Sequence, residues 1–349
     1  MRLLRLLLLS LVIGHSSLVI STAAADNLPL VALFTTGGTI QSKGAHRLTL
    51  MEYNAGRVTP DELLADLPEL KGLARIEVTE ISNVGSGNMD AEKLLRLSKA
   101  ITKELARPEV AGAVVTHGTG TLEETAFFLH LTVKSSKPVV VVGAMRPFTA
   151  ISRDGPYNLY NAVRVAATPE AAGMGALVVL NDTIHSARFV TKGHTYHVET
   201  FVSRELGPIG FVDTDRVVFY RKLLSKHTAA SEFDISALTT LPMVDVVYGY
   251  QEASPAPIAA LTEAGAKGIV FADGSPAFGK AIQAAQSKGV VIVQSDRKGA
   301  GRVTISSNVA ARGQITSDNL NPQKSRILLR LALTKTNETR ELQRIFNEY

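Results

Sequence analysis

Two loops rich in threonine and glycine carry the side chains best suited to chemistry in this chain. The first, at residues 35–40, reads TTGGTI, and the second, at residues 116–121, reads THGTGT. Each loop follows a continuous apolar run, at residues 30–34 and 113–115, which is typical of a strand buried on both faces of a parallel sheet. Ligands bind outside the carboxyl ends of such strands, so we expect both loops to border one crevice lined by hydroxyl groups.

The elements around these loops alternate between strand-like and helical patterns, which predicts an α/β fold with a mostly parallel sheet. The second loop runs into a helical pattern in which Thr121 is expected to be the N-cap of a capping box with Glu124. The start of such a helix favours an anion or a carboxylate. A helical tail is expected from Asn321, as N-cap with Pro322 behind it, to Tyr349.

The pattern loosens between residues 217 and 242, which indicates a linker between two domains. We predict a larger amino-terminal α/β domain at 26–219, a linker at 220–242 and a smaller carboxyl-terminal α/β domain at 243–349. Short strands of the second domain are expected at residues 243–248, 268–272 and 289–293.

The amino terminus has the layout of a secretory signal peptide. Two arginines precede an apolar run from Leu6 to Ile13, and the segment ends in three alanines at residues 23–25. We expect cleavage after Ala25, export to the periplasm and no membrane association afterwards; a membrane anchor is the alternative.

Composition excludes several classes of function. The chain has no cysteine, which excludes thiol catalysis and thiolate metal sites. Without residues 1–25 the 37 basic residues fall to 35 against 32 acidic ones, too mild an excess to indicate nucleic-acid binding. No histidine and carboxylate cluster has metal-ligand spacing, so neither a metal nor an organic cofactor is expected.

From residue 28 to residue 349 the chain resembles the bacterial type II asparaginases, a family of amidohydrolases that includes the glutaminase-asparaginases. The resemblance rests on several motifs in order, which together are far more specific than any one alone. They are TGGTI in the first loop, the second loop, VGAMRP at 142–147, DGPYNLYN at 154–161 and LNPQK at 320–324. The family implies the two-domain α/β fold, a small amino-acid amide as substrate, and a homotetramer whose sites form between subunits.

The resemblance also implies the site residues. Thr39 matches the nucleophile that forms an acyl-enzyme, and Tyr53 matches a tyrosine that contacts it from a lid at residues 41–59. Thr119 and Lys192 match two members of a threonine, aspartate and lysine relay. Ser86 matches a serine that binds substrate, together with Thr119 and the position of Gly120.

Gly120 stands where the family has the aspartate of this relay. A carboxylate there would pair with the substrate ammonium, an interaction worth ~1.5–3 kcal/mol. Gly87 likewise stands where a glutamine is common, and the turn at residues 273–277, supplied in the family to a neighbouring site, has no asparagine. Hydrolysis of L-asparagine, or of L-glutamine, is therefore one hypothesis. A weak or silent homologue that keeps the fold and a binding cleft is another, and a substrate without a free α-amino group is a third.

The residues by themselves leave simpler interpretations open. TTGGTI is also consistent with a tight turn whose glycines serve only the backbone. The lid is also consistent with a surface loop that happens to contain a tyrosine. Lys192 is also consistent with a surface lysine, unless burial lowers its pKa and lets it accept a proton.

Overall fold

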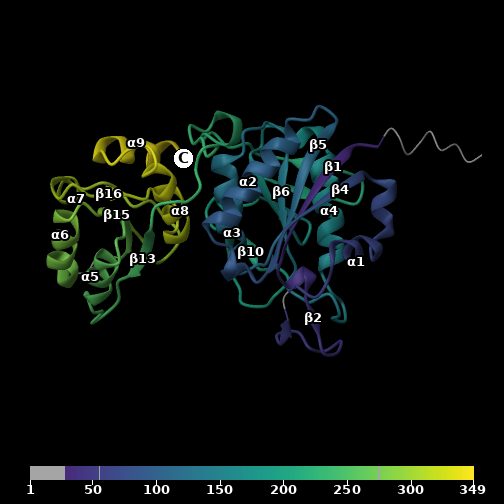
Figure 1. Ribbon diagram of the computed structural model, residues 1–349, viewed down its shortest axis with the longest axis horizontal. Coiled ribbons are helices and arrows are strands. Elements are labelled where there is room, and N and C mark those ends of the chain that lie inside the picture. The colour runs from purple at the N-terminus through teal and green to yellow at the C-terminus, as the bar shows by residue number, and fades with distance from the viewer. Residues whose placement is uncertain (1–27, 55, 274–275) are drawn as a thin grey trace, which may run out of the picture.

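The computed structural model describes residues 28–54, 56–273 and 276–349. Two α/β domains lie side by side, the larger amino-terminal domain in purple to teal and the smaller carboxyl-terminal domain in green to yellow (Figure 1). The predicted signal peptide and two residues of the turn at 273–277 lie outside the described residues. None of the described helices is long and apolar enough to cross a bilayer.

The larger domain is built on an eight-stranded sheet of order β12-β11-β8-β7-β6-β5-β1-β4. Strands β4, β1, β5, β6 and β7 are parallel, and β8, β11 and β12 add antiparallel pairs. The strands are β1 (Leu30–Gly37), β4 (Arg75–Val84), β5 (Val110–Thr116), β6 (Val139–Val142), β7 (Ala176–Leu180), β8 (Thr183–Ser186), β11 (Gly210–Val212) and β12 (Val217–Phe219). The expected mostly parallel sheet is thus confirmed.

Helices cover both faces of this sheet because the central strands are apolar on both sides. Val31 and Leu33 of β1 pack with α4 in one core, whereas Leu30, Ala32 and Phe34 pack with α2 and α3 in another. The helices of the domain are α1 (Pro60–Ala65), α2 (Ala91–Leu105), α3 (Leu122–Thr132) and α4 (Gly155–Ala167). The alternation along β1 places the TTGGTI loop at the carboxyl edge of a strand held from both faces.

Two short hairpins stand beside the carboxyl edge of the sheet. One pairs β2 (Lys43–Gly44) with β3 (Tyr53–Asn54), and the other pairs β9 (Thr191–Lys192) with β10 (Phe201–Val202). The β2–β3 hairpin projects from the sheet at the lower end of the domain in Figure 1. The predicted lid is therefore a hairpin with a long connecting loop.

The smaller domain contains a four-stranded parallel sheet of order β13-β14-β15-β16. Its strands are β13 (Val244–Tyr248), β14 (Gly268–Ala272), β15 (Val291–Ser295) and β16 (Ile315–Thr316), and its helices are α5 (Ala256–Glu263), α6 (Gly279–Ser287), α7 (Ser307–Ala311), α8 (Pro322–Ala332) and α9 (Thr339–Glu348). The strand predicted at 289–293 begins two residues later. Gly289 has φ +83° and its N–H closes the turn that ends α6, so the strand starts only after that turn.

The helical tail predicted from Asn321 to Tyr349 is two helices. Asn321 caps α8 as expected, because its side chain accepts a hydrogen bond from the Lys324 N–H, and Pro322 is the first helical residue. The chain then turns so that Ile345 and Phe346 of α9 enter the apolar core that α8 already faces. One continuous helix would have carried these side chains away from that core.

An apolar core joins the two domains. Phe127, Phe128 and Leu131 of α3 are fully buried together with Leu328 and Leu331 of α8. Burial of each such side chain contributes about 1.5–3 kcal/mol. An interface of this kind holds two domains in a fixed arrangement, so groups on α8 can support residues of the larger domain.

Candidate active site

Three loops meet at the carboxyl edge of the large sheet, after β1, β4 and β5. Strand β1 lies between β4 and β5, so the chain passes to opposite sides of β1 and creates the switch point at which α/β proteins bind ligands. A Cβ atom on Gly38, which has φ +83°, would lie 2.2 Å from the Cα atom of Gly118. A Cβ atom on Gly118 would lie 2.9 Å from the Cβ atom of Ser86. The three loops therefore lie in direct contact with one another, and Gly38 serves this close approach of the backbones.

Thr39 is the first residue of a 3-10 helix (Thr39–Gln41) that begins directly after Gly38. Its side chain is only 6% exposed, and its Oγ1 atom lies 2.7 Å from the Tyr53 hydroxyl in a hydrogen bond that either group can donate. Tyr53 belongs to β3, so the lid hairpin delivers this contact. A phenol at this distance can exchange a proton with the threonine as its oxygen attacks a carbonyl.

Gln41 fixes the nucleophile loop, although the sequence analysis did not identify it. Its buried Oε1 accepts hydrogen bonds from the Gly37 N–H and the Thr116 hydroxyl, each at 3.1 Å. Its Nε2 donates to the Val58 carbonyl at 3.1 Å, where the lid returns to the domain. One amide thus ties together the first loop, the end of β5 and the base of the lid. A polar side chain that is fully buried directly after TTGGTI is visible only in the structure.

The lid is fixed to the larger domain at two glycines. The Gly44 N–H donates a hydrogen bond to the Thr149 hydroxyl at 2.9 Å. Gly56 has φ +76°, and a Cβ atom at that position would lie 2.5 Å from the Asn83 carbonyl oxygen. Both glycines therefore have a structural role near the ends of the lid.

Lys192 and Thr119 form the second catalytic candidate pair. Lys192 lies on β9, and its Nζ donates a hydrogen bond of 2.9 Å to Thr119 Oγ1. Thr119 is 6% exposed, and burial lowers the pKa of Lys192, with no charged neighbour contributing. Partial burial therefore makes this ammonium a better proton donor than a solvated lysine. Lys192 is not the freely solvated surface lysine that was the simpler alternative.

Gly120 leaves open space between this pair and Ser86. The residue is exposed, and its backbone lies outside the left-handed region that favours glycine. A Cβ atom there would meet one close neighbour, Ser86 Oγ at 2.8 Å, which is a hydroxyl able to rotate away. Gly87 has no neighbour within 4 Å of such an atom. The backbone therefore does not demand glycine at either of these two departures from the family pattern.

Two acidic residues of the larger domain, Asp154 and Asp182, serve the scaffold. Asp154 accepts hydrogen bonds from the backbone N–H groups of Met145 and Arg146 at 2.8 and 2.9 Å, which explains why VGAMRP and DGPYNLYN occur together. Asp182 accepts a hydrogen bond from the Asn161 side chain at 2.8 Å. Each of these acids is committed to a structural partner.

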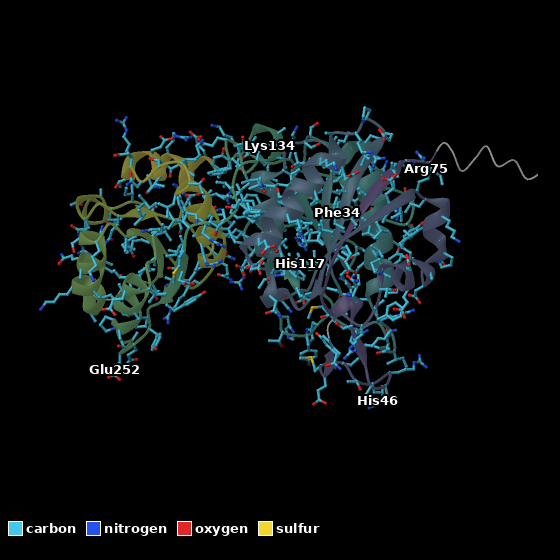
Figure 2. All side chains as sticks on the ribbon, in the orientation of Figure 1. Phe34, His46, Arg75, His117, Lys134 and Glu252 are labelled. Atoms are coloured by element: carbon cyan, nitrogen blue, oxygen red, sulfur yellow. The ribbon has the colours of Figure 1, made fainter. Side chains whose placement is uncertain are left out.

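Two side chains, Thr121 and His117, hold the second loop in place, and the role of Thr121 differs from the one expected. Thr121 is the N-cap residue of α3, but the predicted capping box is wrong because the Thr121 hydroxyl instead donates to the Ser86 carbonyl at 2.8 Å. His117 is fully buried inside the larger domain (Figure 2), and burial lowers its pKa to about 4. Its neutral ring donates to the Gly118 carbonyl and accepts from the Thr125 hydroxyl, so it braces the loop.

Glu123 is a further residue of the site that the sequence analysis missed. Glu123 is only 5% exposed. Its carboxylate accepts a hydrogen bond from the backbone N–H of Lys192 at 2.9 Å. It also accepts hydrogen bonds from the side chains of Asn321 and Gln323 of α8. No sequence pattern separates Glu123 from the adjacent Glu124, because only the packing of α3 decides which of them points inward.

The residues that the structure describes contain no group of three or more histidine, cysteine or acidic side chains arranged to hold a metal ion. The two hydrogen-bonded pairs of the site supply hydroxyl groups and one lysine. These groups can support nucleophilic attack on a carbonyl with proton transfer to a leaving group.

Comparisons with known proteins give the family. The family description "Asparaginase, N-terminal" matches residues 30–225, and "Glutaminase/Asparaginase C-terminal domain" matches residues 243–346. The chain is 49% identical to L-asparaginase 2 of Bacillus subtilis, over 95% of this chain and 90% of that one. It is 42% identical to L-asparaginase 2 of Escherichia coli, over 98% of both chains.

Further relatives extend the comparison to a second named activity and to a solved structure. A glutaminase-asparaginase of Pseudomonas fluorescens is 40% identical over 91% of this chain and 90% of its own length. A probable cytoplasmic L-asparaginase of Campylobacter jejuni has the same fold, with a TM-score of 0.90 and 43% identity over 92% of this chain and 100% of that chain. Both domains, in the same order and over nearly their whole length, place the chain in the asparaginase family of amidohydrolases.

Proposed function

We propose that the protein hydrolyses the side-chain amide of L-asparagine to L-aspartate and ammonia through an acyl-enzyme on Thr39. The observation that carries this proposal is the placement of two hydrogen-bonded pairs on loops in backbone contact. Thr39 Oγ1 meets the Tyr53 hydroxyl at 2.7 Å, and Lys192 Nζ meets Thr119 Oγ1 at 2.9 Å. L-glutamine is a second candidate substrate, because relatives carry the name glutaminase-asparaginase.

The reaction divides into two steps that use the same groups. Thr39 Oγ1 attacks the amide carbon and gives its proton to the Tyr53 oxygen, while Tyr53 releases its own phenolic proton to solvent. The Lys192 ammonium supplies, through Thr119, the proton with which ammonia leaves, and it is then reprotonated from solvent. Water next attacks the ester carbon to form the carboxylic acid, and its proton passes through Tyr53 to Thr39 Oγ1, which leaves as the free hydroxyl. Ser86, Thr119 and the backbone at Gly120 hold the substrate beside these atoms.

Retention of both pairs argues against the silent homologue. Both pairs place groups that can react in hydrogen bonds: a buried threonine with a tyrosine, and a half-buried lysine with a threonine. Names of relatives along the whole chain also favour the enzyme. The substitution at Gly120 affects the expected rate, because the substrate ammonium lacks a carboxylate at that position.

Ammonia release from L-asparagine and L-glutamine by the purified chain tests the proposal. Thr39→Val should abolish release, since it removes the nucleophilic oxygen and keeps the shape of the side chain. Thr35→Val is a matched control on the preceding strand β1, because the buried Thr35 hydroxyl has no hydrogen-bond partner among the residues that the structure describes. Equal release by the Thr39→Val variant and the unchanged chain would refute the acyl-enzyme, and no release from either amide would favour the silent homologue.

The larger organisation is part of the same proposal. Residues 26–219 and 243–349 act as two domains joined by the linker at 220–242, and four copies assemble so that sites form between subunits. Sedimentation at micromolar concentration should show a tetramer, and a monomer would refute the assembly.

Export to the periplasm completes the proposal and rests on the signal-like segment at residues 1–25. The names of relatives divide on this point, since one from Haemophilus influenzae is called periplasmic and the one from Campylobacter jejuni cytoplasmic. Protein recovered from the periplasm should begin near Asp26, and an intact Met1 there would refute cleavage.

A further inference from the structure

The LNPQK motif at residues 320–324 is bound to the segment that carries Lys192. Lys324 bonds directly to the backbone of this segment, and Asn321 and Gln323 bond to Glu123. The junction between the motif and this backbone is Glu123, at the start of α3. We propose that Glu123 is a positioning residue, through which helix α8 of the smaller domain holds Lys192 against Thr119. The inference rests on the proposed function, because it assigns support to a lysine that acts in proton transfer.

The Glu123 carboxylate is shared between the two domains. Its Oε2 accepts the Lys192 backbone N–H at 2.9 Å, and its Oε1 accepts the side-chain N–H groups of Asn321 and Gln323 at 3.1 and 3.2 Å. Lys192 lies 69 residues away in sequence, and the α8 residues lie 198 and 200 residues away. With 5% of its surface exposed, the carboxylate has little access to water, so these three donors supply its solvation.

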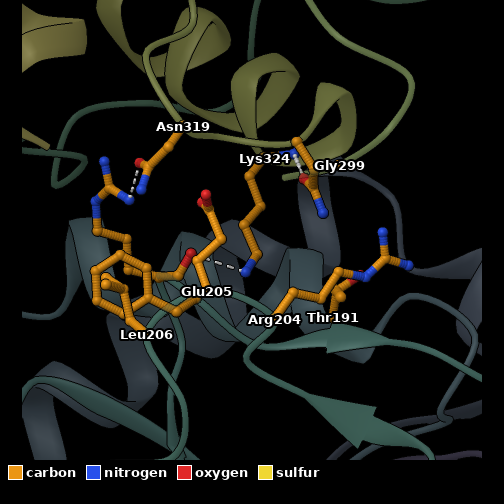
Figure 3. A pocket seen from close by; sticks show the side chains of 10 residues that line it. Thr191, Arg204, Glu205, Leu206, Gly299, Asn319 and Lys324 are labelled. Carbon is orange, nitrogen blue, oxygen red and sulfur yellow. Dashed lines mark hydrogen bonds between the residues drawn. The ribbon is translucent and has the colours of Figure 1, made fainter. Parts of the chain in front are cut away.

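Lys324 holds the same segment from its other side. Its side chain extends away from α8 (Figure 3). It donates to the carbonyl of Arg188 at 3.0 Å and to the carbonyl of Val190. Arg188 in turn donates to the Asn319 side chain at 2.7 Å, just before the motif. The backbone at 188–192 is therefore bound to the smaller domain at its carbonyls by Lys324 and at its last N–H through Glu123.

This arrangement fixes where the Lys192 ammonium can go. A two-residue strand such as β9 has few backbone hydrogen bonds of its own, since it pairs only with β10. The outside supports therefore decide its position, and a displacement of about 1 Å at a catalytic group costs roughly 100-fold in rate. The apolar core between α3 and α8 keeps Glu123 and the motif in register, because both helices are packed into it.

Glu123→Gln and Glu124→Gln form a matched pair of variants on adjacent residues of one helix. Glutamine at position 123 keeps an oxygen that can accept from the Lys192 N–H. Its amide N–H₂ group, however, would face the side-chain donors of Asn321 and Gln323, which need an acceptor. Glu124 instead faces Arg326, with 3.8 Å between their charged groups, and within the described part of the chain its carboxylate has no hydrogen bond or ion pair with Lys192 or Thr119. We expect Glu123→Gln to lower kcat on L-asparagine at least about tenfold with KM little changed, and Glu124→Gln to leave both unchanged.

The pH profile separates positioning from a general loss of folded protein. The limb of kcat/KM that depends on Lys192 should move to higher pH in Glu123→Gln, because a displaced Lys192 loses part of the burial that lowers its pKa, and it should stay in place in Glu124→Gln. Fewer active molecules would lower the rate without moving the limb. An unmoved limb together with unchanged kcat in Glu123→Gln overturns the proposal.

A double-mutant cycle with Lys192→Met makes the assignment specific. If Glu123 acts through the lysine, Glu123→Gln should have no further effect on kcat once Lys192 is gone, whereas additive losses would overturn the proposal. Should Glu123→Gln fail to fold, Gln323→Leu removes one donor at the half-buried rim and should lower kcat in the same direction by less; an unchanged kcat there would count against α8 as the support.

The outcomes also distinguish this inference from the proposed function. Hydrolysis that survives in Thr39→Val would remove the proposed function itself. Hydrolysis that requires Thr39 but is indifferent to Glu123 would remove only the positioning role.

Discussion

Gly120→Asp places a carboxylate at the position where the second loop departs from the asparaginase pattern. The structure allows the change, because the backbone at Gly120 is outside the left-handed region and the residue is exposed. The new Cβ atom would lie 2.8 Å from Ser86 Oγ, so the serine hydroxyl has to rotate and nothing in the backbone has to move. We therefore expect a folded variant whose stability changes by no more than about 1 kcal/mol.

The expected gain follows from the interaction that the carboxylate restores. A charge-assisted hydrogen bond to the substrate ammonium contributes about 1.5–3 kcal/mol, and exposure at Gly120 places the value near the lower end. Since about 1.4 kcal/mol of transition-state stabilisation gives tenfold in rate, kcat/KM for L-asparagine should rise about tenfold. The same carboxylate beside Lys192 should raise the pKa of the lysine and move its limb of the pH profile upward.

Ammonia release, measured as kcat/KM against pH, is the assay, with thermal unfolding measured in parallel. Gly120→Asn is the matched control, because it has the same size without the charge and should give little of the gain. A folded Gly120→Asp variant with no more activity than the unchanged chain would refute the electrostatic reasoning. Equal gains from aspartate and asparagine would show that loop geometry, and not charge, limits the rate.

Other changes probe the remaining parts of the site. Tyr53→Phe removes the 2.7 Å hydrogen bond to Thr39 and should lower kcat about 100-fold in steady-state kinetics without unfolding the protein, so retention of full kcat would exclude Tyr53 from proton transfer. Burial lowers the pKa of Lys192, so the ammonium that donates the proton is lost as pH rises through a value below 10.5, and kcat/KM should fall through that limb; Lys192→Met should not show it. Gly38→Ala should lower the free energy of unfolding in urea by more than about 3 kcal/mol, because its Cβ atom would lie 2.2 Å from the backbone of Gly118. Gly87→Ala should leave this free energy unchanged, because a Cβ atom there has no neighbour within 4 Å. Similar losses in both variants would contradict the argument from close approach.

Buried titratable groups make a separate prediction for stability against pH. Burial lowers the pKa of Lys324 from 10.5 to about 8, so the unfolded chain binds more protons than the folded one between these values. The free energy of unfolding should therefore rise with pH across this window, and the cost of the buried charge should be fully present below about pH 8. Urea titrations of the unchanged chain and of Lys324→Met measure it, and identical pH slopes would contradict the assignment.

The sequence by itself determined the elements and the identity of the nucleophile loop. Alternating apolar strands and helical patterns predict a two-domain α/β fold, because secondary-structure periodicity is a local property of the chain. The TTGGTI loop is equally local, since glycine at position 38 and threonine at position 39 follow directly from the strand that ends there. The order of family motifs then suggested Tyr53, Thr119 and Lys192 as partners.

Local pattern failed where a distant group competed for a side chain. Thr121 has the spacing of a capping box, but its hydroxyl bonds to the Ser86 carbonyl, which arrives from a loop 35 residues earlier. No residue near Thr121 in the sequence indicates that this carbonyl will be its hydrogen-bond acceptor. The sequence also does not show whether the backbone at position 120 requires glycine. Only the backbone conformation shows that a side chain can be accepted there.

Tertiary structure alone decided how the site is held. Glu123 and Glu124 are equivalent in the sequence, and the packing of α3 between the sheet and α8 turns Glu123 inward to bond with residues up to 200 positions away. Gln41 likewise acquires its structural role only because three segments meet around its side-chain amide and bond to it. Contacts of this kind depend on the docking of whole elements, and so they appear only once the chain has folded.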